Sequence, residues 1–400
     1  MKPKRYSGYK SYQYLERGVD YEFFKLAKQI GRVKSKVIKL SKSEEERVEE
    51  ILEKYIVISL HDHIEVLPEN SSDFKEYFRR GRMWIGYEGL ASSCLDGVFE
   101  GLLNGLSLME YGNPWSWNSV IHQIGMFLSD LKHQNFLFLA EKVDDFYKAH
   151  SEGRIAVAIH LEGAPNMDSN LDRVDVLYGL GVRCMGITYS QGNEFGSGLA
   201  DEKDYGLTDL GYKLIDRMNK LGMAIDLAHA SDKTSIEAIE ASRDPVFITH
   251  AGARALWPSR RMKPDEVIQA LAEKGGVIGV EAAPHTTLTY KHRRHSIEAV
   301  MEHFEYIVKL VGIDHVAFGP DTIFGDHVAL HHTFSSELAI SKTRRKLPKY
   351  EEIEFVDGLE NPAEFINIVR WLVKHGYSDN EIKKVIGENV IRVLRRAWKN

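Results

Sequence analysis

Cysteine is scarce in this chain of 400 residues, which contains only Cys94 and Cys184. Two cysteines cannot form the disulfide framework of a small secreted protein. Cys184 lies in the apolar run VRCMGIT, where a free thiol packs as a small hydrophobic group. Long apolar stretches are also lacking, since none has the length of a membrane span or of a signal-peptide core. These absences predict a protein that has no membrane partner and is located in the reducing cytoplasm.

An excess of basic charge is lacking as well. The formal net charge is -6 at pH 7, and charged residues make up 28% of the chain. Nucleic acid is therefore not an expected partner, because proteins that bind it carry a concentrated basic face. Hydrophobic residues make up 43%, which is enough for a large core, and the length suits an α/β barrel with additions.

Apolar, strand-like runs alternate with amphipathic segments from about residue 55 onward. Eight strands are predicted, near residues 56–61, 90–96, 155–160, 183–188, 223–228, 245–250, 276–281 and 315–320. The segments between them, such as TDLGYKLIDRMNKLG, end on glycine, as many helices do. This alternation predicts an α/β fold of the parallel (β/α)8 TIM-barrel type.

The barrel is expected to carry additions at both ends and in two connections. Residues 1–54 are predicted to form an N-terminal helical extension, and residues 55–400 the barrel with its C-terminal helices. An insertion is expected at about 97–150, with a long helix near 118–149. The polar stretch 322–360 follows the last strand, and we interpret it as a lid, as a contact between the subunits of a homodimer, or as a loop without function.

Residues that can bind metal stand at the ends of several of these runs. They are His61 and His63 in VISLHDH, Glu162 in AVAIHLE, His229 in MAIDLAH, His250 in PVFITH and Asp321 in HVAFGPD. Each of them alone has an ordinary structural explanation, such as a hydrogen-bonded core histidine. The carboxyl ends of barrel strands, however, meet at the face where TIM-barrel enzymes carry their active sites. Imidazoles and carboxylates gathered there indicate a metallohydrolase site.

The spacing suggests how such a site is built. His61 and His63 are two residues apart on a strand, so both point to the same side. Glu162 has two oxygens and could bridge two metal ions ~3.5–4 Å apart. His229 and His250 end consecutive strands, which lie ~4.8 Å apart when paired, and could converge on one ion.

Two further residues are candidates for the chemistry. Asp321 is placed to orient or deprotonate a metal-bound water. Arg254 follows in THAGARAL, and its guanidinium either anchors a substrate carboxylate, whose two oxygens match its fork, or forms a structural ion pair.

Several short motifs occur in an order that is hard to obtain by chance. They are LG-V-R, GLT-x-x-G, MN-x-LGM, IDL-x-H and H-x-x-AR, followed by RRMKPDEV, GIDHVAFGPD and GENVIRV. In these motifs the chain resembles the membrane (renal-type) dipeptidases, which are binuclear zinc peptidases within the barrel-shaped metal-dependent hydrolases. The resemblance covers most of the chain after about residue 55 and leaves out the N-terminal extension and the insertion at 97–150.

The resemblance implies a set of metal ligands and a set of catalytic groups. The ligands would be His61, His63, Glu162, His229 and His250, which would hold two zinc ions with Glu162 shared. Arg254 would bind the substrate carboxylate, and Asp321 would be the catalytic aspartate. Tyr189 would contact the substrate, because it stands where the family has a histidine that assists the scissile carbonyl.

Two positions depart from the family's pattern. His63 replaces a ligating aspartate, which removes one negative charge from the site, and an alternative register would instead use His63 with Glu65. Tyr189 replaces a histidine, and a phenol can donate a hydrogen bond to an oxyanion but cannot carry the charge of an imidazolium.

The expected function is that of a metal-dependent hydrolase. It would cleave the amide bond of a dipeptide or a similar small amide through a metal-bound hydroxide. The two departures leave open another amidohydrolase, acting on a lactam, a lactone or an N-acyl amino acid, and a catalytically impaired barrel that serves as a binding protein.

Overall fold

The computed structural model of the chain describes residues 4–102, 115–284, 286–336, 338, 342 and 347–399. Its centre is a parallel sheet of eight strands that curls into a nearly closed barrel. In spatial and chain order the strands are β1 (Ile58–Asp62), β4 (Gly97–Gly101), β6 (Ile155–Leu161), β7 (Val182–Gly186), β8 (Ala224–Asp226), β9 (Phe247–Ala251), β10 (Val277–Val280) and β11 (Val316–Phe318). The predicted TIM-barrel fold is confirmed.

Three short strands lie outside this order. The strand β5 (Leu137–Leu139) pairs in parallel with β6. The strands β2 (Glu65–Val66) and β3 (Trp84–Ile85) form an antiparallel pair of their own.

The barrel closes where β1 meets the segment that follows β11. The backbone N–H of Asp321 donates to the carbonyl of His61 at 3.0 Å. The carboxylate of Asp62 accepts hydrogen bonds from the backbone N–H and the hydroxyl of Thr322, at 2.9 and 2.7 Å, and from the hydroxyl of Ser59 at 2.6 Å. Asp62 therefore ties the first strand to the last, which accounts for an acidic residue between the two predicted ligands of β1.

Apolar side chains fill the barrel below its carboxyl-terminal face. The interior cluster includes Ile58, Phe99, Ala158, Cys184, Phe247 and Ala317. Trp398, near the C-terminus, belongs to the same cluster, and its indole donates to the carbonyl of Arg183 near the start of β7. Because this end is packed with apolar groups, the buried polar groups gather at the carboxyl ends of the strands.

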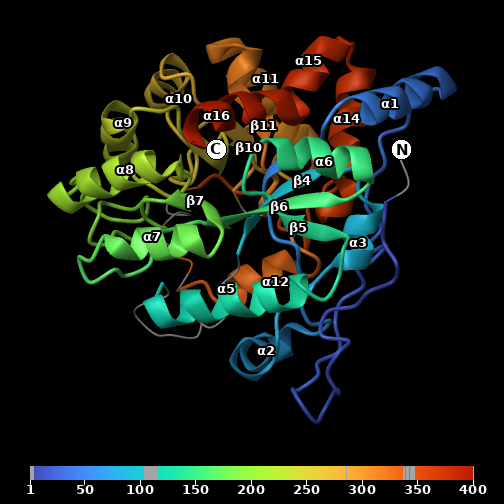
Figure 1. The fold of residues 1–400 in the computed structure, drawn as a ribbon. Coiled ribbons are helices and arrows are strands. Elements are labelled where there is room, and N and C mark those ends of the chain that lie inside the picture. Colours follow the sequence, from blue (N-terminus) through green and yellow to red (C-terminus); the bar gives the residue numbers. More distant parts are fainter. Residues whose placement is uncertain are drawn as a thin grey trace.

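Helices surround the barrel, as Figure 1 shows. They are α1 (Lys42–Lys54), α2 (Phe74–Arg80), α3 (Tyr87–Ser92), α5 (Trp117–Leu131), α6 (Asp144–Glu152), α7 (Asp172–Gly179), α8 (Asp209–Leu221), α9 (Asp232–Ala241), α10 (Asp265–Glu273), α11 (Ile297–Val311), α12 (His327–Thr333), α14 (Ile366–Lys374), α15 (Asp379–Lys383) and α16 (Asn389–Ala397). The helix α8 shows how the sequence sets such boundaries. The Thr208 hydroxyl caps its first turn, and Gly222, with φ of 82°, ends it in the left-handed conformation that glycine adopts at little cost.

Seven of the eight predicted strands are confirmed, and the strand predicted at 90–96 is wrong. Residues 87–92 form α3, and the second barrel strand is β4 at 97–101. The apolar run of β4 is short and is interrupted by Glu100, which is fully buried at its carboxyl end. A charged residue inside a five-residue strand removes the pattern by which buried strands are recognised.

The predicted helix near 118–149 is also corrected, since this stretch holds α5, β5 and α6. The side chain of Gln134 accepts hydrogen bonds from the backbone N–H groups of Phe136 and Leu137, which breaks the helix and starts β5. Part of the expected insertion, residues 103–114, lies outside the described residues.

Both ends of the chain hold helices. In the N-terminal extension the helix is confined to α1, and residues 4–41 form turns and isolated bridges instead. Ser41 and Glu44 form a capping box at the start of α1, and α1 packs against α14 near the C-terminal helices α15 and α16 (Figure 1). The predicted C-terminal helices are confirmed, whereas a domain boundary at residue 54 stays a prediction.

Cys94 and Cys184 are both free and buried. Within the described part of the chain, no helix is long and apolar enough to cross a membrane. The cellular location stays a prediction.

The closure of the barrel predicts an effect of Asp62 on stability. Replacing Asp62 by Ala leaves the buried donors of Thr322 and Ser59 without their acceptor. We expect the free energy of unfolding of the metal-free protein to fall by at least about 3 kcal/mol, because each of the three buried donors left without an acceptor costs about 1–3 kcal/mol. Asp62→Asn keeps an acceptor oxygen for Thr322 and should lose less. Denaturant titration measures both, and equal midpoints for the wild type and Asp62→Ala would contradict this role.

Candidate metal centre

The six residues predicted at strand ends lie together at the carboxyl-terminal face of the barrel. They come from β1 and the residues after it (His61, His63), from the ends of β6 (Glu162), β8 (His229) and β9 (His250), and from the turn after β11 (Asp321). All six are buried, with 8% exposure or less. Their potential ligand atoms form overlapping groups, each with its atoms within 4.8 Å of one another.

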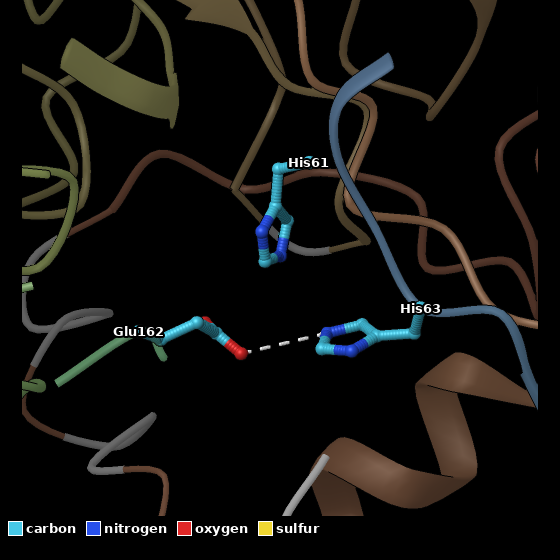
Figure 2. Close-up of side chains that lie close together, drawn as sticks. All are labelled: His61, His63 and Glu162. Carbon is cyan, nitrogen blue, oxygen red and sulfur yellow. Dashed lines mark ion pairs between the residues drawn. The ribbon is translucent and has the colours of Figure 1, made fainter. Parts of the chain in front are cut away.

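Glu162 stands at the junction of two of these groups. One of its oxygens, Oε1, lies 3.7 Å from Nε2 of His63. The other, Oε2, lies 3.0 Å from Nε2 of His229 and 3.5 Å from Nε2 of His250. Figure 2 shows the side chains of His61 and His63, from β1 and the residue after it, and of Glu162, from the end of β6, pointing toward one another. The carboxylate therefore presents one oxygen to each of two sets of imidazoles, as a bridging ligand does.

Asp321 lies beside the first set. Its Oδ1 is 3.3 Å from Nε2 of His61 and 3.2 Å from Nε2 of His63. Its backbone has φ of 57°, in the left-handed region that residues other than glycine rarely adopt. The backbone bond to His61 holds this conformation, and strain of this kind is concentrated at functional sites.

The donor set fits divalent cations. Burial lowers the pKa of His61 to about 3 and holds those of His229 and His250 well below the ordinary value, so these imidazoles are neutral and keep lone pairs for binding. The Nε2 atoms of His229 and His250 are only 3.2 Å apart. Two nitrogens and a carboxylate oxygen at such distances match the ligands that zinc prefers.

The acids of the cluster differ in their environment. Burial raises the pKa of Glu162 to about 8, although the neighbouring charge of His63 opposes the rise. Burial also disfavours ionisation of Asp321, but the imidazoles of His61 and His63, whose Nε2 atoms face its carboxylate, hold its pKa well below the ordinary value. Burial would lower the pKa of His63, yet its bond to Asp321 and the charge of Glu162 raise it to about 10. Without metal, His63 is thus a cation between two acids.

Glycine at two positions lets the cluster assemble. An ideal Cβ at Gly101 would lie 2.2 Å from the His61 ring, which stacks on the His250 ring at 3.6 Å and has little room to move. An ideal Cβ at Gly186 would lie 2.1 Å from the backbone oxygen of Glu162. Both strand ends therefore need a residue without a side chain.

Glu65, which the alternative register would use as a ligand, lies in a neighbouring group with His63 and Glu100. It is absent from the three groups that contain Glu162 or Asp321. His63, not Glu65, faces Glu162, which is the arrangement that the gap-free register predicted. Glu100 was missed because it was placed in the insertion.

Arg254 lies in an ion pair, one of the two alternatives that its sequence context left open. Its Nη1 and Nη2 donate to the carboxylate of Asp232 at 2.5 and 2.9 Å, and its Nε donates to the carbonyl of Met262 at 3.0 Å. The guanidinium that reaches the cluster belongs to Arg261 instead. It is 5% exposed, and its Nη2 lies 3.0 Å from Oε2 of Glu281 without aligned hydrogen-bond geometry. Arg261 is the second arginine of the motif RRMKPDEV, and no role was predicted for it from the sequence.

A cavity of about 60 Å³ opens beside the cluster. It is lined by His63, Glu162, Tyr189, Ser190, His229, Arg261, Ala283, Thr286, Asp321, His327, Leu330, His331 and Leu338. Tyr189 stacks on the ring of His229 at 4.1 Å, so its predicted place near the centre agrees with the geometry. The stretch 322–360 supplies one wall through α12, which packs beside α2 (Figure 1). His327 was missed, although the run GDHVALHH contains it.

Two curated dipeptidases are similar to the chain. Dipeptidase tcpJ of Claviceps purpurea is 27% identical over 261 residues, and dipeptidase aclJ of Aspergillus oryzae is 29% identical over 266 residues. Each alignment covers 65% of this chain but only 55% and 56% of the relatives. The chain thus spans about half the length of these relatives.

Solved structures share the fold. An amidohydrolase from Pseudomonas aeruginosa has a TM-score of 0.71 and 24% identity, over 88% of this chain and 99% of its own. A metallo peptidase from Rhodobacter sphaeroides, liganded with a phosphinate mimic of the dipeptide L-Ala-D-Ala, has a TM-score of 0.65 and 18% identity, over 86% and 99%.

A family model for the membrane dipeptidases, peptidase family M19, matches residues 119–332 and 349–400, more than half of the chain. The match includes residues 119–150, which the sequence analysis wrongly left outside the resemblance. It begins after β1, so the departure at His63 lies outside the matched part. The predicted resemblance is confirmed, and the chain belongs to the membrane dipeptidase family, peptidase family M19.

Proposed function

We propose that the chain is a metal-dependent hydrolase that cleaves the amide bond of dipeptides or similar small amides. The arrangement of Glu162 carries this proposal. A buried carboxylate whose two oxygens face two separate sets of imidazoles has the geometry of a ligand shared by two cations. Family membership supports the same chemistry.

In the proposed site, His61 and His63 hold one ion with Glu162, and His229 and His250 hold the other. Zinc is the cation that suits this donor set best, because imidazole nitrogen and carboxylate oxygen are its common ligands. Two such ions, when bound, supply a hydroxide nucleophile near neutral pH and polarise the scissile carbonyl.

The residues of the chain would orient the reactants and move the proton. Asp321 stays ionised next to His61 and His63, so it can accept a proton from the nucleophile and deliver it to the leaving amine. Burial raises the pKa of Tyr189 well above its ordinary value, so its phenol keeps its proton and can donate a hydrogen bond to the developing oxyanion.

We assign the anchoring of the substrate carboxylate to Arg261 rather than to Arg254. Arg261 lines the cavity, and its Nη2 has no aligned acceptor. The fork of Arg254 is already occupied by Asp232. A guanidinium beside the reacting centre would position a dipeptide by its terminal carboxylate.

The cavity supports a small substrate. Its volume of about 60 Å³ is far below the ~300–1,000 Å³ typical of sites for drug-sized ligands. The position of Tyr189 favours a second candidate, an amidohydrolase acting on an N-acyl amino acid, a lactam or a lactone. A neutral phenol can donate a hydrogen bond to the carbonyl group of any of these substrates, and this contact does not require the free amine of a dipeptide. A homodimer and a cytoplasmic location stay predictions.

Metal content and turnover test the proposal together. With zinc, manganese or cobalt added, we expect the purified protein to retain about two ions per chain and to hydrolyse members of a dipeptide panel. Glu162→Gln should bind metal more than about 100-fold more weakly than the wild type. Replacing a residue that only supports a ligand costs up to about 100-fold, and the loss of a ligand should cost more. Glu152→Gln, a change in a surface ion pair with Arg154, is the matched control and should behave as the wild type.

Three outcomes would decide against the dipeptidase. Turnover of N-acyl amino acids or lactones without any dipeptide would favour the second candidate. Fewer than about one ion per chain, unchanged by Glu162→Gln, would favour a binding protein without catalysis. Full activity in Glu162→Gln would contradict the shared-ligand role.

The assignment of Arg261 predicts a difference between two arginine variants. Arg261→Met should lower kcat/KM for dipeptides by about 10- to 100-fold, because a hydrogen-bonded charge contributes about 1.5–3 kcal/mol. The loss should appear mainly in KM and should be small for dipeptides with an amidated C-terminus, which lack the carboxylate. Arg254→Met should leave kcat/KM unchanged. The opposite result, a loss confined to Arg254→Met, would return the anchoring role to Arg254.

A further inference from the structure

Behind the candidate metal centre, three buried side chains form a row through the barrel. Nδ1 of His61 lies 3.1 Å from Nδ1 of His160. Nε2 of His160 lies 3.1 Å from Oδ2 of Asp226. All three residues have 0% exposure. The row links the last residues of β1, β6 and β8, and His160 precedes Glu162 by two positions on β6.

Asp226 has a fixed orientation in this row. Its Oδ1 accepts hydrogen bonds from the backbone N–H groups of Ala228 at 3.0 Å and Thr249 at 2.8 Å. Thr249 lies within β9 and Ala228 lies two residues after β8, and Oδ2 is left facing His160. An ionised carboxylate only accepts hydrogen bonds, and Nε2 of His160 must therefore donate to it.

The direction of this bond determines the next one. A neutral imidazole carries one N–H, so His160 with its proton on Nε2 has a lone pair on Nδ1. Nδ1 of His61 must then donate to it. This places the proton of His61 on Nδ1 and leaves a lone pair on Nε2, the atom that faces Asp321 and has no aligned hydrogen-bond partner.

We propose that Asp226 and His160 act as positioning residues that fix the tautomer of His61, so that its Nε2 is free to bind a metal ion. Histidine ligands commonly donate their other N–H to a fixed acceptor, which sets the ring orientation and raises the basicity of the ligating nitrogen. Here the acceptor is a second histidine, itself oriented by a buried carboxylate. The stack of His61 on His250 at 3.6 Å holds the ring plane at the same time.

The inference rests on the proposed function only in that it takes His61 as a ligand, and its structural part can be tested without metal. Asp226→Asn is the sharpest variant, because it keeps the size of the side chain. Its oxygen can still accept from Ala228 and Thr249, which turns the amide N–H₂ toward His160. His160 must then accept at Nε2 and donate from Nδ1, and His61 must carry its proton on Nε2.

The experiment combines two measurements on each protein. The first is the ring tautomer of His61, from the ¹⁵N shifts of metal-free protein labelled at histidine, with the signal assigned through His61→Gln. The second is zinc affinity, from competition with a chromophoric chelator. In the wild type we expect the Nδ1–H tautomer. In Asp226→Asn we expect the Nε2–H tautomer and zinc binding weaker by about 10–100-fold, the usual effect of changing an outer partner of a ligating histidine.

A second variant covers the case in which Asp226→Asn does not fold. In His160→Gln the amide N–H₂ can still donate to Asp226, but the acceptor for Nδ1 of His61 is removed. We expect the same loss of zinc affinity there. The matched control is His303→Gln, which alters another fully buried histidine that accepts from Ala253 and donates to Leu288. It should lower thermal stability and leave the tautomer of His61 and zinc affinity unchanged.

Two results would overturn the proposal. One is an Nε2–H tautomer of His61 in the wild type, which would mean that His160 donates to His61. The other is zinc affinity within twofold of the wild type in both Asp226→Asn and His160→Gln. If the wild type bound no zinc, the metal-dependent function would fail, whereas the tautomers of wild type and Asp226→Asn would still decide whether the row sets the proton on His61.

Discussion

The burial of one carboxylate, that of Glu162, is the constraint on which the rest of the site depends. A carboxylate removed from water is costly unless cations or donors surround it. Three imidazoles approach its two oxygens within 3.0–3.7 Å, and the positive charge of Arg261 lowers its pKa against the effect of burial. Metal binding would place a cation beside each oxygen of Glu162 and would offset the cost of burying its negative charge more fully. The apolar filling of the lower barrel confines such a group to the carboxyl ends of the strands.

Most of the barrel strands and most residues of the polar cluster could be predicted from the sequence, for a physical reason. Buried parallel strands are continuous apolar runs, and a polar residue at the end of such a run stands out against it. His229, His250 and Glu162 are of this kind. The strand β4 and its residue Glu100 were not predicted, because a charged residue inside the strand interrupts the apolar run by which a buried strand is recognised.

Other parts of the site depend on tertiary contacts that no local pattern encodes. Arg254 and Arg261 lie in one loop, and each has a carboxylate partner in space, Asp232 and Glu281. Which of them faces the cavity is decided by the path of the loop and not by residue type. The role of His160 could not be predicted either, because its partner Asp226 comes from β8 and lies beside it only in the folded barrel.

The nitrogen-rich composition of the cluster bears on the choice of metal. His63 stands where the resemblance implies an aspartate, and in the groups that contain Glu162 or Asp321 these two residues are the only acids. Fewer anionic oxygens weaken the attraction for hard ions such as magnesium and calcium, and imidazole favours zinc and its neighbours in the transition series. In the proposed centre, a histidine at position 63 would therefore favour zinc and its neighbours over hard ions.

The site divides between the barrel and its loops. Every proposed ligand stands on a strand end or within three residues of one, and small residues such as Gly101 and Gly186 allow the close approach. Several groups that face the cavity without belonging to the ligand set, such as Tyr189, Arg261 and His327, come from connections between strands. Loops accept substitutions at lower cost than paired strands. A change such as the one at Tyr189 can thus alter which carbonyl compound is accepted while the metal cluster beneath it keeps its geometry.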